Sequence, residues 1–146
     1  NWSDWSSDVC SSDLLEYIPE DLVKSDNNPK ILLKVRDLTK GKRGDVLYRL
    51  AAAEDNDVVI YLSEHQIAPI PLTPKILSTN SFKIIRQDES GALYSKEGLG
   101  IDIVASYVRN CYDICIDGNK ILKDIKYCHQ LQHFLFGLGI NHKMEV

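Results

Sequence analysis

The sequence has no long apolar run and no excess of basic residues, and each absence excludes a class of function. The longest apolar stretches, such as Val58–Leu62, have the length of a strand and fall far short of the roughly 18 residues that would cross a bilayer. The formal net charge is -4 over 146 residues, so the chain as a whole does not attract DNA or an anionic membrane. We therefore expect a soluble protein without a membrane partner.

Cysteine is also scarce. The four cysteines (Cys10, Cys111, Cys115 and Cys128) have neither the density of a secreted disulfide scaffold nor the paired spacing of a zinc ribbon. Cys111 and Cys115 are four residues apart on an expected strand, and such a pair more often lines a buried apolar strip than forms a reactive thiol pair. The simplest interpretation is a reducing, cytoplasmic setting.

The first fourteen residues, NWSDWSSDVCSSDL, contain no lysine or arginine, although they hold both tryptophans of the chain. They have neither the basic start nor the apolar centre of a signal peptide. The stretch resembles translated sequencing-adapter read-through, which occurs at the ends of reading frames assembled from environmental DNA. We therefore treat 1–14 as a non-native, adapter-like segment and expect it to lie outside the fold.

Length and composition fit one ordinary globular domain. We expect a poorly defined N-terminal segment over 15–44, with one short strand at Ile31–Val35, followed by a single α+β domain over 45–146. The expected fold is a small antiparallel sheet of hairpins with one short central helix and one C-terminal amphipathic helix. The sequence shows no internal repeat and no low-complexity linker.

Turn and cap residues locate these elements. Apolar residues from Val46 and a β-branched run from Val58 predict a hairpin around the turn EDND, and a second hairpin is expected around DESG at 88–91. Further strands are expected at 101–107 and 111–116, and Asp117-Gly118 is a favoured hairpin turn. Thr73 and Pro74 predict the start of the short helix, and Asp124 is the expected cap of the final helix, which should run to about Phe136.

The segment 34–43 is rich in basic residues. It holds one acid, Asp37, and two glycines that interrupt regular structure, so we expect a basic loop. Its basic residues are Lys34, Arg36, Lys40, Lys42 and Arg43. Clustered lysine and arginine suit phosphate contacts, but the loop lacks interleaved aromatic residues for base stacking and lacks the pattern of a P-loop. The expected state is a solvated loop beside the acidic turn at 54–57, and the alternative is weak nucleic-acid contact.

The stretch CHQLQH, Cys128–His133, raises the possibility of a metal site. On a helix, His129 and His133 share one face, which is the polar face, whereas Cys128 lies on the apolar stripe. Because a zinc site needs at least three protein ligands, the pair would have to recruit a further group from elsewhere in the chain. We expect a solvated face and no metal, with His129 able to hydrogen-bond to a neighbouring loop; metal binding through His129 and His133 is the third alternative function.

Other catalytic and binding motifs are incomplete. DICIDGNKILKD at 113–124 imitates a calcium loop, but Cys115 replaces an oxygen ligand and Asp124 replaces the bidentate glutamate. A hairpin explains the stretch better. No G-x-S-x-G or comparable nucleophile context is present, and no paired carboxylates lie in an apolar setting. We expect neither an enzyme nor a cofactor.

Two patterns carry a resemblance: PIPLT followed by IL, and YCHQLQ followed by FLFGL. They are similar to PIPLTxxIL and YxHxLQxxxFxL in a group of small uncharacterised proteins of gut anaerobes, their phages and mobile elements. The matching residues are Pro69, Ile70, Pro71, Leu72, Thr73, Ile76, Leu77, Tyr127, His129, Leu131, Gln132, Phe136 and Leu138. The resemblance covers roughly 45–142 and implies kinship and a genomic setting, but no activity.

The function expected from the sequence is therefore that of a non-enzymatic accessory protein that binds another protein. Pro69 and Pro71 should hold an extended edge, and a stiff edge loses little entropy when it docks. The surface beside the last helix is a second expected docking region. The alternatives are weak nucleic-acid contact through 34–43 and metal binding by the histidine pair.

Overall fold

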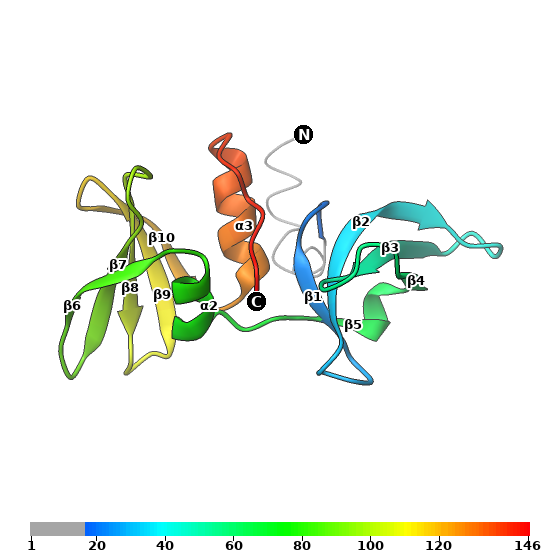
Figure 1. Ribbon diagram of the computed structural model, residues 1–146, viewed down its shortest axis with the longest axis horizontal. Coiled ribbons are helices and arrows are strands. Elements are labelled where there is room, and N and C mark those ends of the chain that lie inside the picture. The colour runs from blue at the N-terminus through cyan, green and yellow to red at the C-terminus, as the bar shows by residue number, and fades with distance from the viewer. Residues whose placement is uncertain (1–16) are drawn as a thin grey trace. The chain divides into compact units, whose positions relative to one another are not determined.

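The computed structural model describes residues 17–146, so the adapter-like segment predicted over 1–14 lies outside the described residues. Contacts divide the chain into two compact units (Figure 1). Unit 1 comprises the described residues up to Ile70 together with Gln132–Met144, and unit 2 comprises Pro71–Leu131 with Glu145–Val146. Each unit contains one antiparallel sheet.

The sheet of unit 1 is built from five strands that follow one another along the chain. These are β1 (Leu22–Ser25), β2 (Leu32–Lys40), β3 (Val46–Ala52), β4 (Val59–Leu62) and β5 (Ile67–Pro69), with the 3-10 helix η2 (Glu64–Gln66) before β5. The strand order is β4-β3-β2-β1-β5, and every pair is antiparallel. The chain therefore forms a four-strand meander and returns to place β5 beside β1.

The core of unit 1 comes from alternate residues of these strands. Val23, Leu33, Val35, Tyr48, Leu50 and Ile67 form one buried cluster with Tyr17. Tyr17 and Tyr48 meet edge to face with ring centroids 5.7 Å apart. Burying each aliphatic or aromatic side chain contributes about 1.5–3 kcal/mol, so this cluster stabilises unit 1 substantially.

Unit 2 contains a simple five-strand meander and a short helix. Helix α2 (Pro74–Thr79) precedes β6 (Lys83–Gln87), β7 (Gly91–Ser95), β8 (Ile101–Ser106), β9 (Cys111–Ile116) and β10 (Asn119–Ile125). The strand order is β10-β9-β8-β7-β6. Helix α3 (Cys128–Gly137) follows β10, and the division between the units falls within it. The fully buried residues of unit 2 include Leu77, Ile103 and Ile114.

Several local predictions are confirmed. Asp117 and Gly118 have φ values of 52° and 78°, as a two-residue turn with two positive φ angles requires. Thr73 caps α2 by accepting a hydrogen bond from the Ile76 N–H at 3.2 Å, and Pro74 occupies the first turn. The hairpins predicted around 54–57 and 88–91 are present as β3–β4 and β6–β7.

Other parts of the fold differ from the prediction. The described residues are mostly β, with two five-stranded antiparallel sheets in place of one, so the α+β class is supported only loosely. Among the described residues the first strand begins at Leu22, and both β1 and β2 lie wholly within the segment 15–44 that was expected to be poorly defined. These strands form because each pairs on both sides: β1 with β2 and with the distant β5, and β2 with β1 and β3. The number of folding domains stays a prediction.

The final helix also begins later than predicted. Asp124 lies in β10 with φ 59° and does not cap α3. The Gln130 side chain instead accepts hydrogen bonds from the Lys126 and Tyr127 N–H groups at 2.8 and 2.9 Å, and the helix starts at Cys128. No helix within residues 17–146 is both long enough and apolar enough to cross a bilayer.

Candidate functional site

The basic segment is a strand over most of its length, so the predicted loop is wrong. Residues up to Lys40 belong to β2, and only the residues that follow form a tight turn, in which the Gly41 N–H donates to the Asp45 carbonyl at 2.7 Å. Within the strand, Lys34 and Arg36 lie 3.6 and 3.8 Å from the Glu20 carboxylate. Both basic groups are therefore already used by an acid of unit 1.

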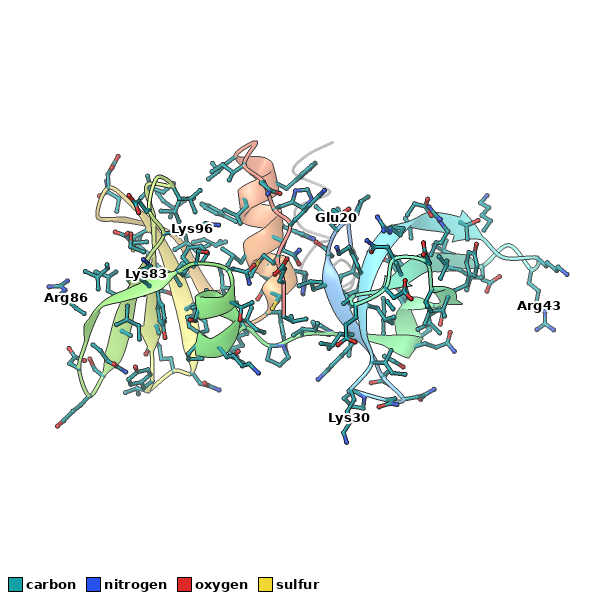
Figure 2. The ribbon with its side chains drawn as sticks, viewed as in Figure 1. Glu20, Lys30, Arg43, Lys83, Arg86 and Lys96 are labelled. Atoms are coloured by element: carbon teal, nitrogen blue, oxygen red, sulfur yellow. The ribbon has the colours of Figure 1, made fainter. Side chains whose placement is uncertain are left out.

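Lys40, Lys42 and Arg43 remain exposed at the tip of the β2–β3 hairpin, and Figure 2 shows Arg43 directed away from the strands. The acidic turn at 54–57 follows the far end of β3, so it does not lie beside this tip as expected. None of the three basic residues forms an ion pair within the part of the chain that the structure describes.

The proline segment is an edge only in part. Pro69 ends β5, which is an edge strand of its sheet as predicted. Pro71, however, forms an isolated bridge with Tyr127, and the Leu72 N–H donates to the Lys126 carbonyl at 2.8 Å. Ile70 and Leu72 are each only 6% exposed. Pro71 is exposed and Pro69 is half-buried, so only the two prolines of this segment face solvent, and docking through them stays a prediction.

The histidine pair does not lie on a solvated face, which corrects the helical-wheel prediction. His129 is 6% exposed, and its ring stacks on Tyr127 at a centroid distance of 5.9 Å. His133 Nε2 lies 2.6 Å from Asp21 Oδ2. Burial raises the pKa of the neighbouring Cys128 thiol to about 12, which makes it a poor metal ligand. Among residues 17–146 there is no group of three or more histidine, cysteine, aspartate or glutamate residues that could hold a metal.

Asp21 and Gln132 form a buried polar cluster in unit 1 that the sequence analysis did not identify. Gln132 is fully buried; its Oε1 accepts from the Leu22 N–H at 2.9 Å, and its Nε2 donates to the Glu20 and His142 carbonyls at 2.8 and 3.0 Å. Asp21 Oδ2 accepts from the Ile18 N–H at 2.9 Å. The only available signal was Gln132 itself, a polar residue between apolar positions of the final helix, because its partners in the N-terminal part of unit 1 are far away in sequence.

The environment of Asp21 affects its ionisation. Burial raises the pKa of this carboxyl, and the hydrogen bond and positive charge of His133 oppose the shift without cancelling it. Asp21 Oδ1 is buried and has no hydrogen-bond partner among the described residues. The pair of Asp21 and His133 joins the N-terminal part of unit 1 to the segment Gln132–Met144, and removing the two groups from water costs free energy.

The second polar cluster lies in unit 2 and explains the stretch that imitates a calcium loop. Asp113 is 1% exposed and lies 3.0 Å from Arg109 and 3.1 Å from Lys120, and it accepts from the Asp124 N–H at 3.0 Å. Burial opposes ionisation of Asp113, but the Asp124 N–H, Lys120 and Arg109 outweigh it and lower the pKa of this carboxyl. Residues 113–124 belong to the β9–β10 hairpin, and the Asp113 carboxylate forms ion pairs with Arg109 and Lys120.

The most accessible strand of either sheet is β6, which the sequence analysis predicted as a strand but not as a binding surface. All five of its residues are exposed, and Ile84 and Ile85 are 48% and 60% exposed. The strand pairs with β7 on one side, and on its other side it pairs with no strand in residues 17–146. Lys83 and Arg86 are the charged residues of this strand, and Figure 2 shows Arg86 directed outward from it.

Two hollows border β6, both within unit 2. One, of about 480 Å³, is lined by Phe82, Ile84 and Tyr94 together with residues of α2. The other, of about 500 Å³, is lined by Arg86, Gly91, Leu93 and Val104. An exposed sheet edge offers main-chain hydrogen bonds to an extended peptide, and hollows beside it offer room for the peptide's alternate side chains.

No protein-family model, curated protein or solved structure matches this chain. The candidate sites therefore rest on the geometry of the chain itself.

Proposed function

We propose that this chain is a non-enzymatic accessory protein that binds another protein. The observation that carries the proposal is the exposed edge of β6, where two isoleucines lie in solvent beside a sheet edge whose outer side pairs with no described strand. Isolated apolar residues on a surface are ordinary, but two consecutive ones on an unpaired edge expose both apolar area and backbone hydrogen-bonding groups. A protein segment satisfies both requirements at once.

The buried carboxylates support a binding role in preference to a catalytic one. Asp113 is held by Arg109 and Lys120, and Asp21 is held by His133 and the Ile18 N–H. These contacts connect parts of the same unit, which is what a structural cluster does. The assignment to the cytoplasm rests on the free thiols of Cys111, Cys115 and Cys128. A phage or mobile-element setting rests on the resemblance of the two sequence patterns.

A library of random peptides displayed on phage tests the proposal, because it samples many partner sequences at once. Panning on the purified, immobilised chain should enrich a consensus, and synthetic peptides with that consensus should bind the chain in solution. The control is the same panning on a heat-unfolded sample, from which the consensus should be missing. Enrichment of no sequence over the control would contradict the proposal.

Weak contact with nucleic acid is the second candidate, and the exposed tip of the β2–β3 hairpin favours it. Lys40, Lys42 and Arg43 are close in sequence and exposed, as phosphate contacts require. Three contacts supply little affinity at physiological salt, so this candidate ranks below protein binding.

A further inference from the structure

We propose that β6 accepts an extended segment of a partner protein as a sixth strand of the unit 2 sheet, and that this segment alternates acidic with apolar residues. The inference rests on the proposed function and specifies its site and the chemistry of the partner. It follows from the pairing register of β6, from the two hollows beside it and from its charge.

The register assigns the side chains of β6 to two different faces. Ile84 lies opposite Tyr94, so it shares the face of the sheet on which the buried Tyr94 lies. Lys83 lies opposite Ser95 and Arg86 opposite Leu93, so both basic residues share the other face. The strand thus has an apolar face and a basic face, and the extra residue at the irregularity between Ile84 and Arg86 is Ile85.

An added strand would meet both faces. Its own side chains alternate between the faces of the sheet, because the period of a strand is two residues. On the apolar face they would enter the hollow lined by Phe82, Ile84 and Tyr94, which Lys83 also lines. On the basic face they would approach Arg86 and the hollow beside Leu93, which Asp88 also lines, so that Arg86 is the group there that attracts an acid. Apolar residues suit the first position and carboxylates suit the second, which gives the alternating pattern.

The charge of the strand favours an acidic partner. Lys83 and Arg86 are both exposed, and β6 contains no acid. Lys96 lies over the Phe82 ring at 5.7 Å from its centroid and adds a third positive charge near the start of the strand. The nearest acids in sequence are Asp88 and Glu89 of the adjoining turn, and Asp88 Oδ1 already accepts from Ser90 and Gly91.

The same charges disfavour a second copy of this chain at the same edge. Antiparallel pairing of β6 with β6 in the register that aligns the two Ile84-Ile85 pairs would place Lys83 of one copy opposite Arg86 of the other, and facing like charges are destabilising. Lysine on an edge strand is a common protection against such self-pairing. A partner with carboxylates at the matching positions removes the repulsion.

The other three sheet edges, those of β10, β5 and β4, are less suitable for an added strand. The register of β10 shifts twice along its pairing with β9, and Lys120 of β10 is committed to Asp113. In unit 1, Pro69 has no backbone N–H, so the β5 edge lacks a hydrogen-bond donor that an added strand would need. The edge of β4 is flanked by Asp57 and Glu64 and carries no lysine or arginine. The β10 edge also exposes Ile121 and Leu122 beside Lys123, but it contains the acid Asp124, whereas β6 contains no acid.

The experiment uses a fluorescein-labelled ten-residue peptide that alternates glutamate with valine or isoleucine, and measures anisotropy with the full chain. The peptide should bind, and the same peptide with lysine for glutamate should not. Lys83→Glu combined with Arg86→Glu should weaken the acidic peptide at least about tenfold and allow the lysine peptide to bind. Lys40→Glu combined with Lys42→Glu is the matched control and should leave the affinity within about twofold. A peptide N-methylated at alternate amides should lose binding, because it lacks the donors for strand pairing.

Equal binding of the acidic and lysine peptides would overturn the inference, as would indifference to the double reversal in β6 or to N-methylation. A dimer of the chain that the β6 reversal abolishes would assign the edge to a second copy and would also overturn it. So would an oligonucleotide that displaces the acidic peptide from β6. If a consensus peptide from panning still binds the β6 reversal variant, the proposed function stands and the assignment to β6 fails.

Discussion

At the residue scale, the structure depends on polar groups that local sequence patterns do not reveal. Asp21 and His133 are 112 positions apart, and no periodicity relates them. The prediction that Cys128 lies on the buried face of the helix is confirmed, but a helical wheel allows one buried face, whereas His129 and Gln132 are buried as well. Burial on more than one side of a helix is a tertiary effect, so the sequence of the helix could not predict it.

The carboxyl of Asp21 makes stability depend on pH. Burial raises its pKa in the folded state above the unfolded value of about 3.9, so its contribution is fully present below that value and is lost as the pH rises through the folded pKa. The stability advantage of the native chain over Asp21→Asn should therefore shrink as the pH rises above about 4, by about 1.4 kcal/mol for each unit that separates the two pKa values. Urea unfolding of both proteins across this range measures the difference. An advantage that grows with pH would show that the pairing with His133 outweighs burial.

Gly91 is required by a close approach of two strands. A Cβ at this position would overlap the carbonyl oxygen of Ala105 in β8, which is backbone and cannot rotate away. Gly91→Ala should cost about 1–3 kcal/mol of unfolding free energy, as overpacking does. Gly137→Ala is the control, because a Cβ there meets nothing within 4 Å and alanine favours a helix. Equal unfolding midpoints in urea for the two variants would refute the steric argument.

At the element scale, turns and caps were predictable and strand partners were not. Asp117-Gly118 specifies its own turn, and Thr73 with Pro74 specifies the start of α2, because each signal acts over a few residues. Asp124 carries an equally good cap signal, yet its backbone belongs to β10 and its carboxylate lies 2.6 Å from Arg109. In the same way, pairing with β3 makes a strand of most of the segment 34–43, which its glycines and charges alone predict as a loop.

The tip of the β2–β3 hairpin gives the prediction for nucleic acid. With Lys34 and Arg36 paired to Glu20, only Lys40, Lys42 and Arg43 remain for phosphates. We expect no retention of labelled single- or double-stranded DNA at about 150 mM salt, where the Debye length is about 8 Å. At low salt, alanine at all three positions should reduce the log–log slope by roughly 0.7–0.9 for each contact. Micromolar binding at physiological salt that the triple substitution abolishes would place nucleic acid ahead of protein as the partner.

At the scale of the whole molecule, the composition of the chain indicated the type of secondary structure but not how the strands are arranged into sheets. The spacing of turn residues indicated antiparallel hairpins, and both sheets are built from them. The division into two sheets could not be predicted, because a series of hairpins does not specify which neighbouring strands share a sheet, and the pairing of β5 with β1 joins strands that are distant in sequence. Length and the apolar fraction suit one ordinary domain, and they do not distinguish one sheet from two.

The prediction of a single domain has a direct thermodynamic consequence. If residues 17–146 fold as one domain, amides of β2 in unit 1 and of β8 in unit 2 should lose protection from exchange at the same urea concentration. Their apparent unfolding free energies should also agree. Two separate midpoints would show that the two sheets belong to independently folding domains.

The central claim is that β6 is a binding edge, and amide hydrogen exchange tests it most directly. In the free chain, those β6 amides that point away from β7 should exchange rapidly, because no described strand accepts their hydrogen bonds. Addition of the alternating glutamate peptide should slow these amides and leave the amides of β10, at the opposite edge of the sheet, unchanged. The account predicts protection confined to β6 and its immediate neighbours. Unchanged exchange in β6 under saturating peptide, or new protection at β10 instead, would contradict it.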